Sequence, residues 1–164
     1  MTSLTLYPDV PCSYPNTVGA TITTAVTNSP KVLAAFRNDS SVPSLRGVMQ
    51  RLDFTNFNPS GDTLVTLQLV GGGTAVGGSW GSVGGYSQFD INTTATSFSG
   101  GTAALTTYDY VVLGNKTLPS SLASLDAENL GLVLPQGMEF AIIAFTEEAE
   151  TIDIAWSVNW LEKD

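Results

Sequence analysis

Histidine is absent from this sequence of 164 residues, and cysteine occurs once. These shortages exclude every catalytic triad or dyad that uses histidine, any metal site built from histidine and cysteine clusters, and a disulfide within the chain. Charged residues are also scarce, at 13%, whereas apolar residues make up 43%. Disordered chains combine low hydrophobicity with high charge, so this composition predicts a folded protein. The length fits one domain, which at this size builds a core without a metal or disulfide.

Basic residues are few and lie mostly in the first part of the chain. The formal net charge is −9, from 15 acidic and 6 basic residues. Residues 1–60 hold a slight excess of bases, whereas acids dominate residues 126–164. A phosphate backbone repels such a chain, so we expect no nucleic-acid partner. The acidity fits either a solvated surface or docking to a protein through faces of different charge.

Long apolar runs and a basic, apolar leader are both missing from the sequence. A membrane-spanning helix needs about 18 or more apolar residues, so we expect no membrane partner and synthesis in the cytoplasm. Cys12 has no cation near it in sequence and is expected to remain a reduced, unreactive thiol.

Prolines and tyrosines are concentrated in residues 1–17. Three prolines disfavour a helix or a central strand there, so this segment is predicted to be an extended arm. Residues 18–164 are predicted to form the folded domain. The arm lies along this domain or along a neighbouring molecule, and Tyr7 and Tyr14 are its candidate contact residues.

After the arm, apolar and polar residues alternate with the two-residue period of β-strands. The pattern is clearest in residues 48–55 and 64–70, which flank a turn cluster at 58–62 and are predicted to pair as a hairpin. Residues 151–161 are predicted to form a central strand, because one face is entirely apolar and needs a cover. Five residues share that face: Ile152, Ile154, Trp156, Val158 and Trp160.

About eight strands with regular turn signals predict an all-β fold, a two-sheet antiparallel β-sandwich and in particular a jelly roll. Near residues 118–129 the apolar period changes to three or four, which allows at most one short helix. Residues 71–85 are rich in glycine but lack the ending of a phosphate-binding loop, so we expect a flexible loop between strands. Trp80 within it is either packed on the sheet or offered to a partner.

No group of residues matches a catalytic or cofactor site. The acids at 147–153 crowd one turn, unlike the separated carboxyl pair of a glycosidase, and their spacing matches no calcium loop. The lysines fit no Ser-x-x-Lys arrangement. We therefore expect a protein without enzymatic activity, cofactor or metal. Trp156 and Trp160 are expected to pack in the core rather than form a platform for sugars.

Two stretches of the sequence resemble a known family. The run from Leu52 to Leu69 resembles a hairpin of β-sandwich proteins in tailed-phage virions, and so does the ending from Gly137 to Glu162. A final strand that closes in Asn-Trp-x-Glu is similar to the jelly-roll decoration, or cement, proteins of phage heads. This resemblance implies a homotrimer with a tumour-necrosis-factor-like fold that clamps neighbouring capsid subunits.

The resemblance and the lack of catalytic residues predict a structural virion protein, a capsid decoration protein that binds the major capsid protein and stabilises the shell. It is expected on the capsid surface, after synthesis in the host cytoplasm. Three subunits that make weak contacts together raise avidity by about 10²–10⁴. The arm and the basic segment 31–51 are the expected contact surface. Five residues are the candidates for partner binding: Tyr7, Tyr14, Arg37, Arg46 and Trp80.

Two other functions fit the sequence. One is a carbohydrate- or receptor-binding module of a phage tail or fibre, which requires Trp80 or several tyrosines to be exposed around a shallow groove. The other is a hydrolase with an unusual carboxylate pair that includes Glu147 or Glu150. The sequence does not separate a head protein from a tail protein.

Overall fold

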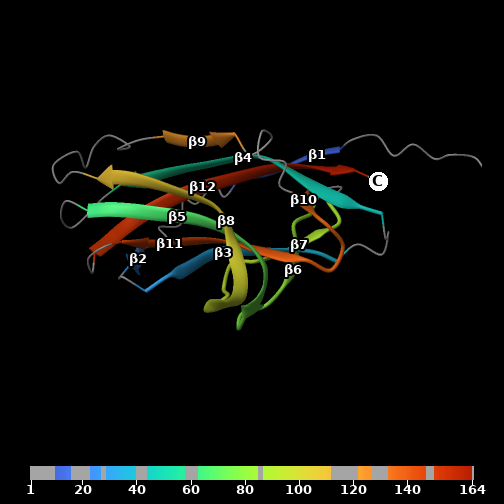
Figure 1. Ribbon diagram of the computed structural model, residues 1–164, viewed down its shortest axis with the longest axis horizontal. Helices are drawn as coiled ribbons and strands as arrows, with labels where there is room; N and C mark the ends of the chain where they lie inside the picture. The colour runs from blue at the N-terminus through green and yellow to red at the C-terminus, as the bar shows by residue number, and fades with distance from the viewer. Residues whose placement is uncertain are drawn as a thin grey trace, which may run out of the picture.

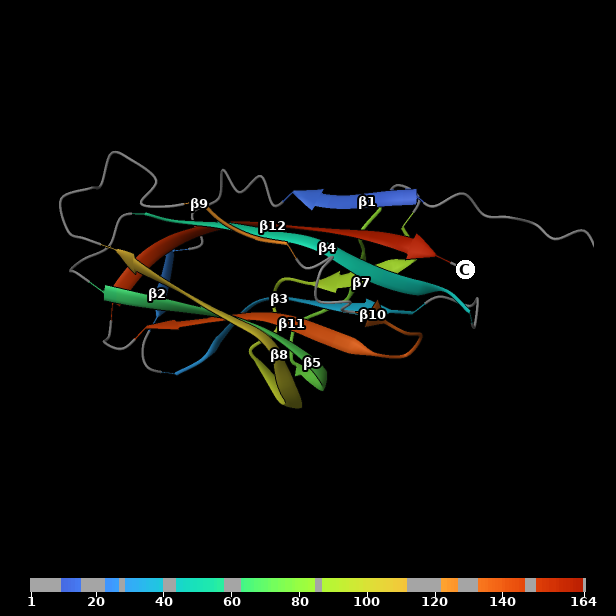
Figure 2. The same cartoon turned by 45° about the horizontal axis from the view of Figure 1, so that its top comes forward.

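Both layers of the protein are β-sheets. The computed structural model describes residues 10–15, 23–26, 29–39, 44–57, 63–84, 87–111, 122–126, 133–146 and 150–163. Every regular element in this part of the chain is a strand, and the strands form two antiparallel sheets that face each other (Figure 1, Figure 2). The predicted all-β sandwich is therefore confirmed.

Among the described residues, each sheet has six strands. The first sheet consists of β1 (Val10–Pro15), β2 (Thr23–Val26), β4 (Arg46–Phe57), β9 (Leu122–Asp126), β10 (Val133–Leu134) and β12 (Glu150–Lys163). The second sheet consists of β3 (Lys31–Asn38), β5 (Thr63–Val76), β6 (Gly81–Ser82), β7 (Phe89–Asn92), β8 (Ser97–Val111) and β11 (Glu139–Thr146).

The strand order is that of a jelly roll. In the first sheet β1 and β2 pair with one edge of β12, β12 pairs with β4, and β9 and β10 pair with the other edge of β4. The second sheet has the order β6, β7, β3, β11, β5, β8. We count β1–β2 as one strand and β9–β10 as one strand, and we treat β6–β7 as an insertion. The first sheet then contains the first, eighth, third and sixth strands in that order. The second sheet contains the second, seventh, fourth and fifth. Apart from β5 and β8, which pair within the second sheet, consecutive strands of this count lie in different sheets, as in two linked Greek keys.

The predicted hairpin of residues 48–55 and 64–70 is wrong. These residues lie in β4 and β5, which belong to different sheets. β4 pairs with β12, whereas β5 pairs with β11 and β8. Alternation and a turn signal show that two strands follow each other in sequence. They do not show whether the second strand returns beside the first or crosses to the facing sheet.

The short helix allowed near residues 118–129 is not found in the described part of that segment. Leu122–Asp126 form β9, which pairs antiparallel with residues 51–55 of β4; residues 118–121 and 127–129 lie outside the described residues. None of the residues that the structure describes belongs to a helix long and apolar enough to cross a membrane.

The structure describes only part of the segment that was predicted to be an arm. Residues 10–15 form β1, which pairs with β12 of the same chain, whereas residues 1–9 and 16–22 lie outside the described part. Pro11 and Pro15 have no backbone N–H to donate, and β1 accommodates them because it lies at the edge of the sheet.

β12 is a central strand, as its sequence predicts. It has β1 and β2 on one side and β4 on the other. Ile154, Trp156, Val158 and Trp160 are all buried, and they lie between the two sheets. The side chain of Ile152 lies outside the described residues.

Aromatic rings fill the space between the sheets. Phe36 of β3 stacks on Phe140 of β11 with ring centroids 4.8 Å apart, and it meets Trp160 edge-on at 5.7 Å. Trp160 in turn stacks on Phe89 of β7 at 5.4 Å. Pairs of this kind contribute about 0.5–1.5 kcal/mol beyond the burial of their area. The interior is therefore occupied by side chains from both sheets.

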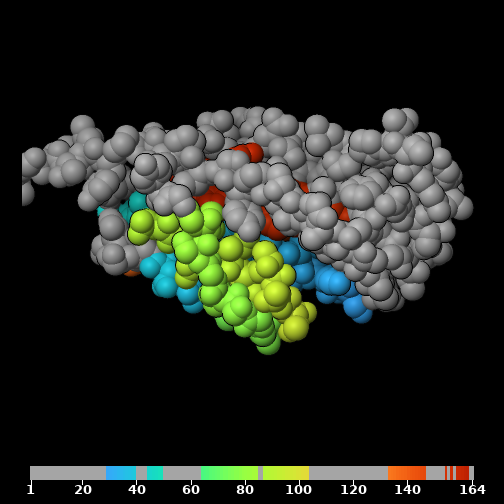
Figure 3. Space-filling view, turned by 180° about the vertical axis from the view of Figure 1, so that it is seen from behind, coloured from blue at the N-terminus to red at the C-terminus, as the bar shows by residue number. Residues whose placement is uncertain are grey.

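A second, smaller cluster of apolar side chains lies on the outer face of the second sheet. It includes Ala35 of β3 and Ile143 of β11, and residues such as Trp80 and Phe98 pack against it. β5 and β8 curve together where their glycines, among them Gly72 and Gly100, have positive φ (Figure 1). The end of β5 and the start of β8, which pair with each other, project from the body of the molecule (Figure 3).

The surroundings of Gly47 and Gly71 predict opposite effects on stability when each glycine is replaced by alanine. A Cβ on Gly47 would lie 2.3 Å from Cζ of the buried Phe89, whereas a Cβ on Gly71 would have nothing within 4 Å. We expect Gly47→Ala to lower the free energy of unfolding by about 1–3 kcal/mol through overpacking. Gly71→Ala should raise it by about 0.4–1 kcal/mol, because alanine restricts the unfolded chain. Urea denaturation measures both, and equal effects would contradict the packing described here.

Candidate functional site

The structure brings together two of the five predicted contact residues. Arg37 lies near the end of β3, and Trp80 lies between β5 and β6, far away in sequence. The guanidinium carbon of Arg37 is 4.6 Å from the centroid of the Trp80 ring, a cation–π contact. Trp80 is half-buried against the outer apolar cluster. Of the two arrangements predicted for this side chain, the structure therefore shows the one packed on the sheet.

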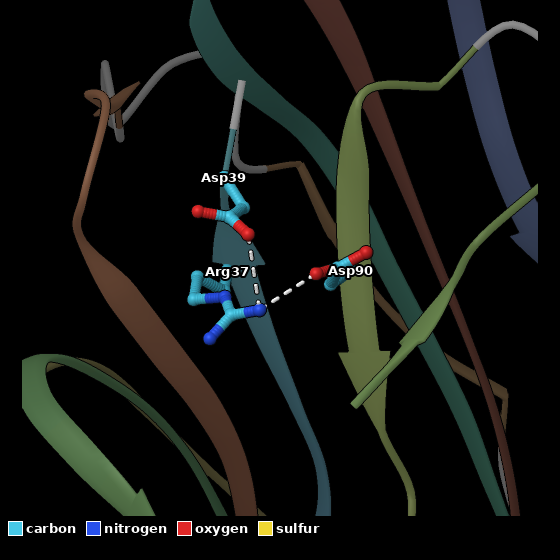
Figure 4. Close-up of polar contacts among 3 residues, drawn as sticks. All are labelled: Arg37, Asp39 and Asp90. Carbon is cyan, nitrogen blue, oxygen red and sulfur yellow. Dashed lines mark hydrogen bonds and ion pairs between the residues drawn. The ribbon is translucent and has the colours of Figure 1, made fainter. Parts of the chain in front are cut away.

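Arg37 is held by two carboxylates as well as by the ring. Its Nη2 lies 2.7 Å from Oδ2 of Asp90 and 3.1 Å from Oδ2 of Asp39 (Figure 4). Asp90 faces Arg37 across the β3–β7 pairing, so a cross-strand position places this opposite charge. The Arg37 and Asp90 side chains are only 29% and 25% exposed, whereas Asp39 is 63% exposed. The guanidinium is thus fixed in place, and the group of three side chains carries a net negative charge.

Buried polar side chains fix the segment that carries Trp80. Asn92 is fully buried; its Nδ2 donates to the carbonyl of Gly77 at 3.0 Å, and its Oδ1 accepts from the backbone N–H of Thr94 at 3.0 Å. On the other side, Oε2 of Glu139 accepts from the backbone N–H of Ala75 at 2.6 Å. The prediction of a flexible loop over 71–85 is wrong at its start, because residues 71–76 continue β5. These bonds hold Trp80 beneath Arg37.

Arg46, a third predicted contact residue, lies at the same end of the sandwich as Arg37. It begins β4 and is exposed to solvent. The fully buried Asn38, at the end of β3, connects the two strands, because its Nδ2 donates to the carbonyls of Leu45 at 2.9 Å and Leu134 at 3.1 Å. One amide therefore joins β3, the start of β4 and β10. We call the surface around Arg37 and Trp80, on the outer face of the second sheet, the contact end. Arg46 lies on the outer face of the first sheet, because the next residue, Gly47, faces the buried Phe89.

The two predicted tyrosines are not brought into this group. Tyr14 lies in β1 opposite Val158 of β12, and thus belongs to the first sheet. Tyr7 lies outside the described residues. The structure describes no contact between either tyrosine and Arg37 or Trp80.

Glu162 is a buried acid that the sequence pattern did not single out as a site. It is 6% exposed and accepts three hydrogen bonds: from Oγ of Ser87 at 2.5 Å, from the backbone N–H of Gln88 at 2.9 Å and from Nε1 of Trp160 at 3.0 Å. The signal was present, because Glu162 continues the inward phase of Trp156, Val158 and Trp160. Its oxygens are occupied by donors, so this carboxylate fastens β12 to the start of β7 rather than acting as a base.

The described residues contain no cluster of metal-ligating side chains. Within the ranges that the structure describes, no three histidine, cysteine, aspartate or glutamate side chains lie close enough together to hold a metal ion. The acidic cluster at residues 147–149 lies outside those ranges. What the contact end offers is an ordered surface of a clamped arginine and a half-buried tryptophan.

We compared the chain with family models, with curated proteins and with solved structures, and none of the three comparisons found a match.

Proposed function

We propose that this protein is a structural virion protein, a capsid decoration protein that binds the major capsid protein on the head surface and stabilises the shell. The jelly-roll strand order carries the proposal, because this fold recurs in proteins that build viral capsids. The final strand carries part of the resemblance to this family. It forms the central strand β12, which supports the proposal. The resemblance of residues 52–69 adds nothing, because those residues do not form the hairpin that it implied.

The aromatic side chains packed in the centre of the sandwich favour action through the outer surface. Phe36, Phe140 and Trp160 occupy the space between the sheets, and the buried carboxylate of Glu162 is fully used in hydrogen bonds. A protein built in this way binds through surfaces that its core holds rigid, and rigid surfaces lose little entropy on binding. As part of this proposal, the protein has no enzymatic activity and no nucleic-acid or membrane partner.

In this proposal the protein acts as a homotrimer on the capsid surface, after synthesis in the host cytoplasm. Each subunit presents a contact end with Arg37 and Trp80, and Arg46 adds an exposed cation on the first sheet. Arginine and tryptophan are the residue types that most often dominate binding energy at protein interfaces. Three such ends engage a shell together, so weak individual contacts give stable attachment.

A carbohydrate-binding role is less well supported than the capsid role. Sugar stacking needs an open aromatic face, but the guanidinium of Arg37 lies over the Trp80 ring. Saturable glycan binding that is lost in Trp80→Ala would favour that alternative over the capsid role.

Binding to capsids tests the proposal directly. We expect the purified protein to be a trimer by light scattering and to sediment with expanded capsids of the virus that encodes it. Arg37→Ala should weaken this binding about tenfold or more, because the loss releases Trp80 and unpairs Asp90. Arg37→Lys should restore little of it, since an ammonium group does not reproduce the planar guanidinium on the ring.

Lys31 provides the matched control. It is an exposed cation at the opposite end of β3, so Lys31→Ala removes the same charge without touching the contact end. Circular dichroism establishes that each variant is folded. A monomeric wild type that ignores capsids would overturn the proposal, and equal binding by Arg37→Ala and Lys31→Ala would remove the contact end from it.

A further inference from the structure

An apolar pocket opens where the two sheets meet beside β10. Its volume is about 300 Å³, and it is lined by Met49, Leu69, Gly71, Gly72, Thr102, Val133, Leu134, Met138 and Phe140. Met49, Leu69, Leu134 and Phe140 belong to the main core and are at most 5% exposed. Val133 and Met138 are 45% and 37% exposed and form the rim. The pocket thus reaches from solvent into the core.

A missing side chain creates this space. Val65, Leu67 and Leu69 of β5 alternate inward and are buried, and the next inward position is Gly71. Gly71 stands opposite Phe140 of β11 on one side and Thr102 of β8 on the other, and both of these residues line the pocket. A Cβ built on Gly71 meets nothing within 4 Å. The hydrophobic row across the sheet therefore has a gap at its centre.

The lining determines the chemistry of the occupant. None of the lining residues is charged, and Thr102 is the one with a polar side chain. A volume of about 300 Å³ holds roughly ten non-hydrogen atoms, at about 30 Å³ for each water-sized group. A charged group would lose its hydration there without gaining a partner. We propose that the pocket binds a small neutral molecule with an aliphatic or aromatic body and at most one hydroxyl group.

Depth favours a small molecule over a partner's surface. The innermost walls are core side chains such as Met49 and Phe140, and an occupant that touches them lies between the two sheets. A cleft with apolar walls of this kind is typical of preformed small-molecule sites. This inference is independent of the capsid role, because it uses no residue of the contact end.

The methionines allow a direct test with 1-octanol as the probe. The sequence has 3 methionines, and two of them, Met49 and Met138, line the pocket. In ¹³C-methyl methionine spectra of the full chain, we expect 1-octanol to shift these two signals saturably while the Met1 signal stays in place. Absence of a saturable shift at Met49 and Met138 up to the solubility limit would overturn the proposal.

Variants at Gly71 locate the binding. Gly71→Val places a side chain in the gap and should weaken 1-octanol binding about tenfold or more, since each displaced methylene contributes about 0.8 kcal/mol. Gly81→Val is the control, because Gly81 is an exposed strand glycine at which an added Cβ would also have nothing within 4 Å. If Gly71→Val does not fold, Gly71→Ala takes its place, with a smaller loss expected.

The remaining outcomes also decide the question. Unchanged affinity in a folded Gly71 variant, or an equal loss in Gly81→Val, would show that 1-octanol binds elsewhere and would contradict the site. Shifts of Met49 and Met138 that depend on protein concentration without 1-octanol would show that a second copy of the chain fills the pocket. That result would also overturn a small-molecule site.

Discussion

Trp160→Ala should lower the free energy of unfolding by about 3–5 kcal/mol, a large fraction of the total. Trp160 is fully buried, stacks on Phe89, meets Phe36 edge-on and donates its indole N–H to Glu162. Truncation of a buried aromatic residue costs about 3–5 kcal/mol, and the free energy of unfolding of a typical domain is about 5–15 kcal/mol. Loss of the indole donor also leaves a buried carboxylate with one partner fewer. Thermal denaturation followed by near-ultraviolet circular dichroism measures the loss.

Two further variants separate ring packing from the hydrogen bond. Trp160→Phe keeps an aromatic ring but removes the donor to Glu162, and should cost about 1–3 kcal/mol. Phe145→Ala removes an aromatic side chain that is only half-buried against the same core, so its cost should be smaller than that of Trp160→Ala. Equal losses for Trp160→Ala and Phe145→Ala would refute a central role of Trp160 in the core.

Asn38→Asp should destabilise the protein by about 3–5 kcal/mol, although the two side chains have nearly the same shape. The amide nitrogen of Asn38 donates to two carbonyl oxygens, those of Leu45 and Leu134, in a fully buried position. A carboxylate there would place negative oxygen against both acceptors and unpair them. Urea denaturation of the variant and the wild type gives the difference in the free energy of unfolding.

pH provides an independent check on this prediction. Burial beside carbonyl oxygens disfavours the charged form, so the folded-state pKa of the introduced carboxyl group lies above its unfolded value. The destabilisation should therefore be largest at neutral pH and should shrink as the pH falls. Asn92→Asp is the matched control, because the amide nitrogen of this buried residue donates to one carbonyl and its oxygen already acts as an acceptor. A larger loss for Asn92→Asp than for Asn38→Asp would contradict this account.

The strands and their buried faces were largely predictable from the sequence, but their partners were not. Residues 151–161 carry an apolar row long enough to predict a central strand, and Ile154 to Trp160 fill that role. Pairing is different, because β4 and β5 each have an apolar face that suits either sheet. A bulge also makes the prediction wrong at one position of β4. The alternation of Leu52 and Phe54 predicts that Val48 is buried. The register of β4 shifts opposite Asn159 and Trp160, so Met49 is buried instead.

The sequence predicted which residues belong to the candidate site, but it did not predict how they are arranged. Arg37 stands out in the sequence as a cation in a basic segment, and Trp80 as an aromatic residue in a glycine-rich segment. Their contact depends on the path of the chain from β5 to β7 over the outer face of the second sheet, which no local pattern encodes. The pocket was not predictable for a similar reason, since Gly71 is one glycine of many until β8, β10 and β11 surround it.

The pairing of β12 has a consequence for synthesis on the ribosome. In the described part of the chain, β1 and β2 pair with β12 and with no other strand. Translation produces β1 and β2 long before β12, so both must wait, without their hydrogen-bond partner, until residues 150–163 have emerged from the exit tunnel. The first sheet is therefore completed late, and its closure requires contacts between segments at great sequence separation, which fold slowly.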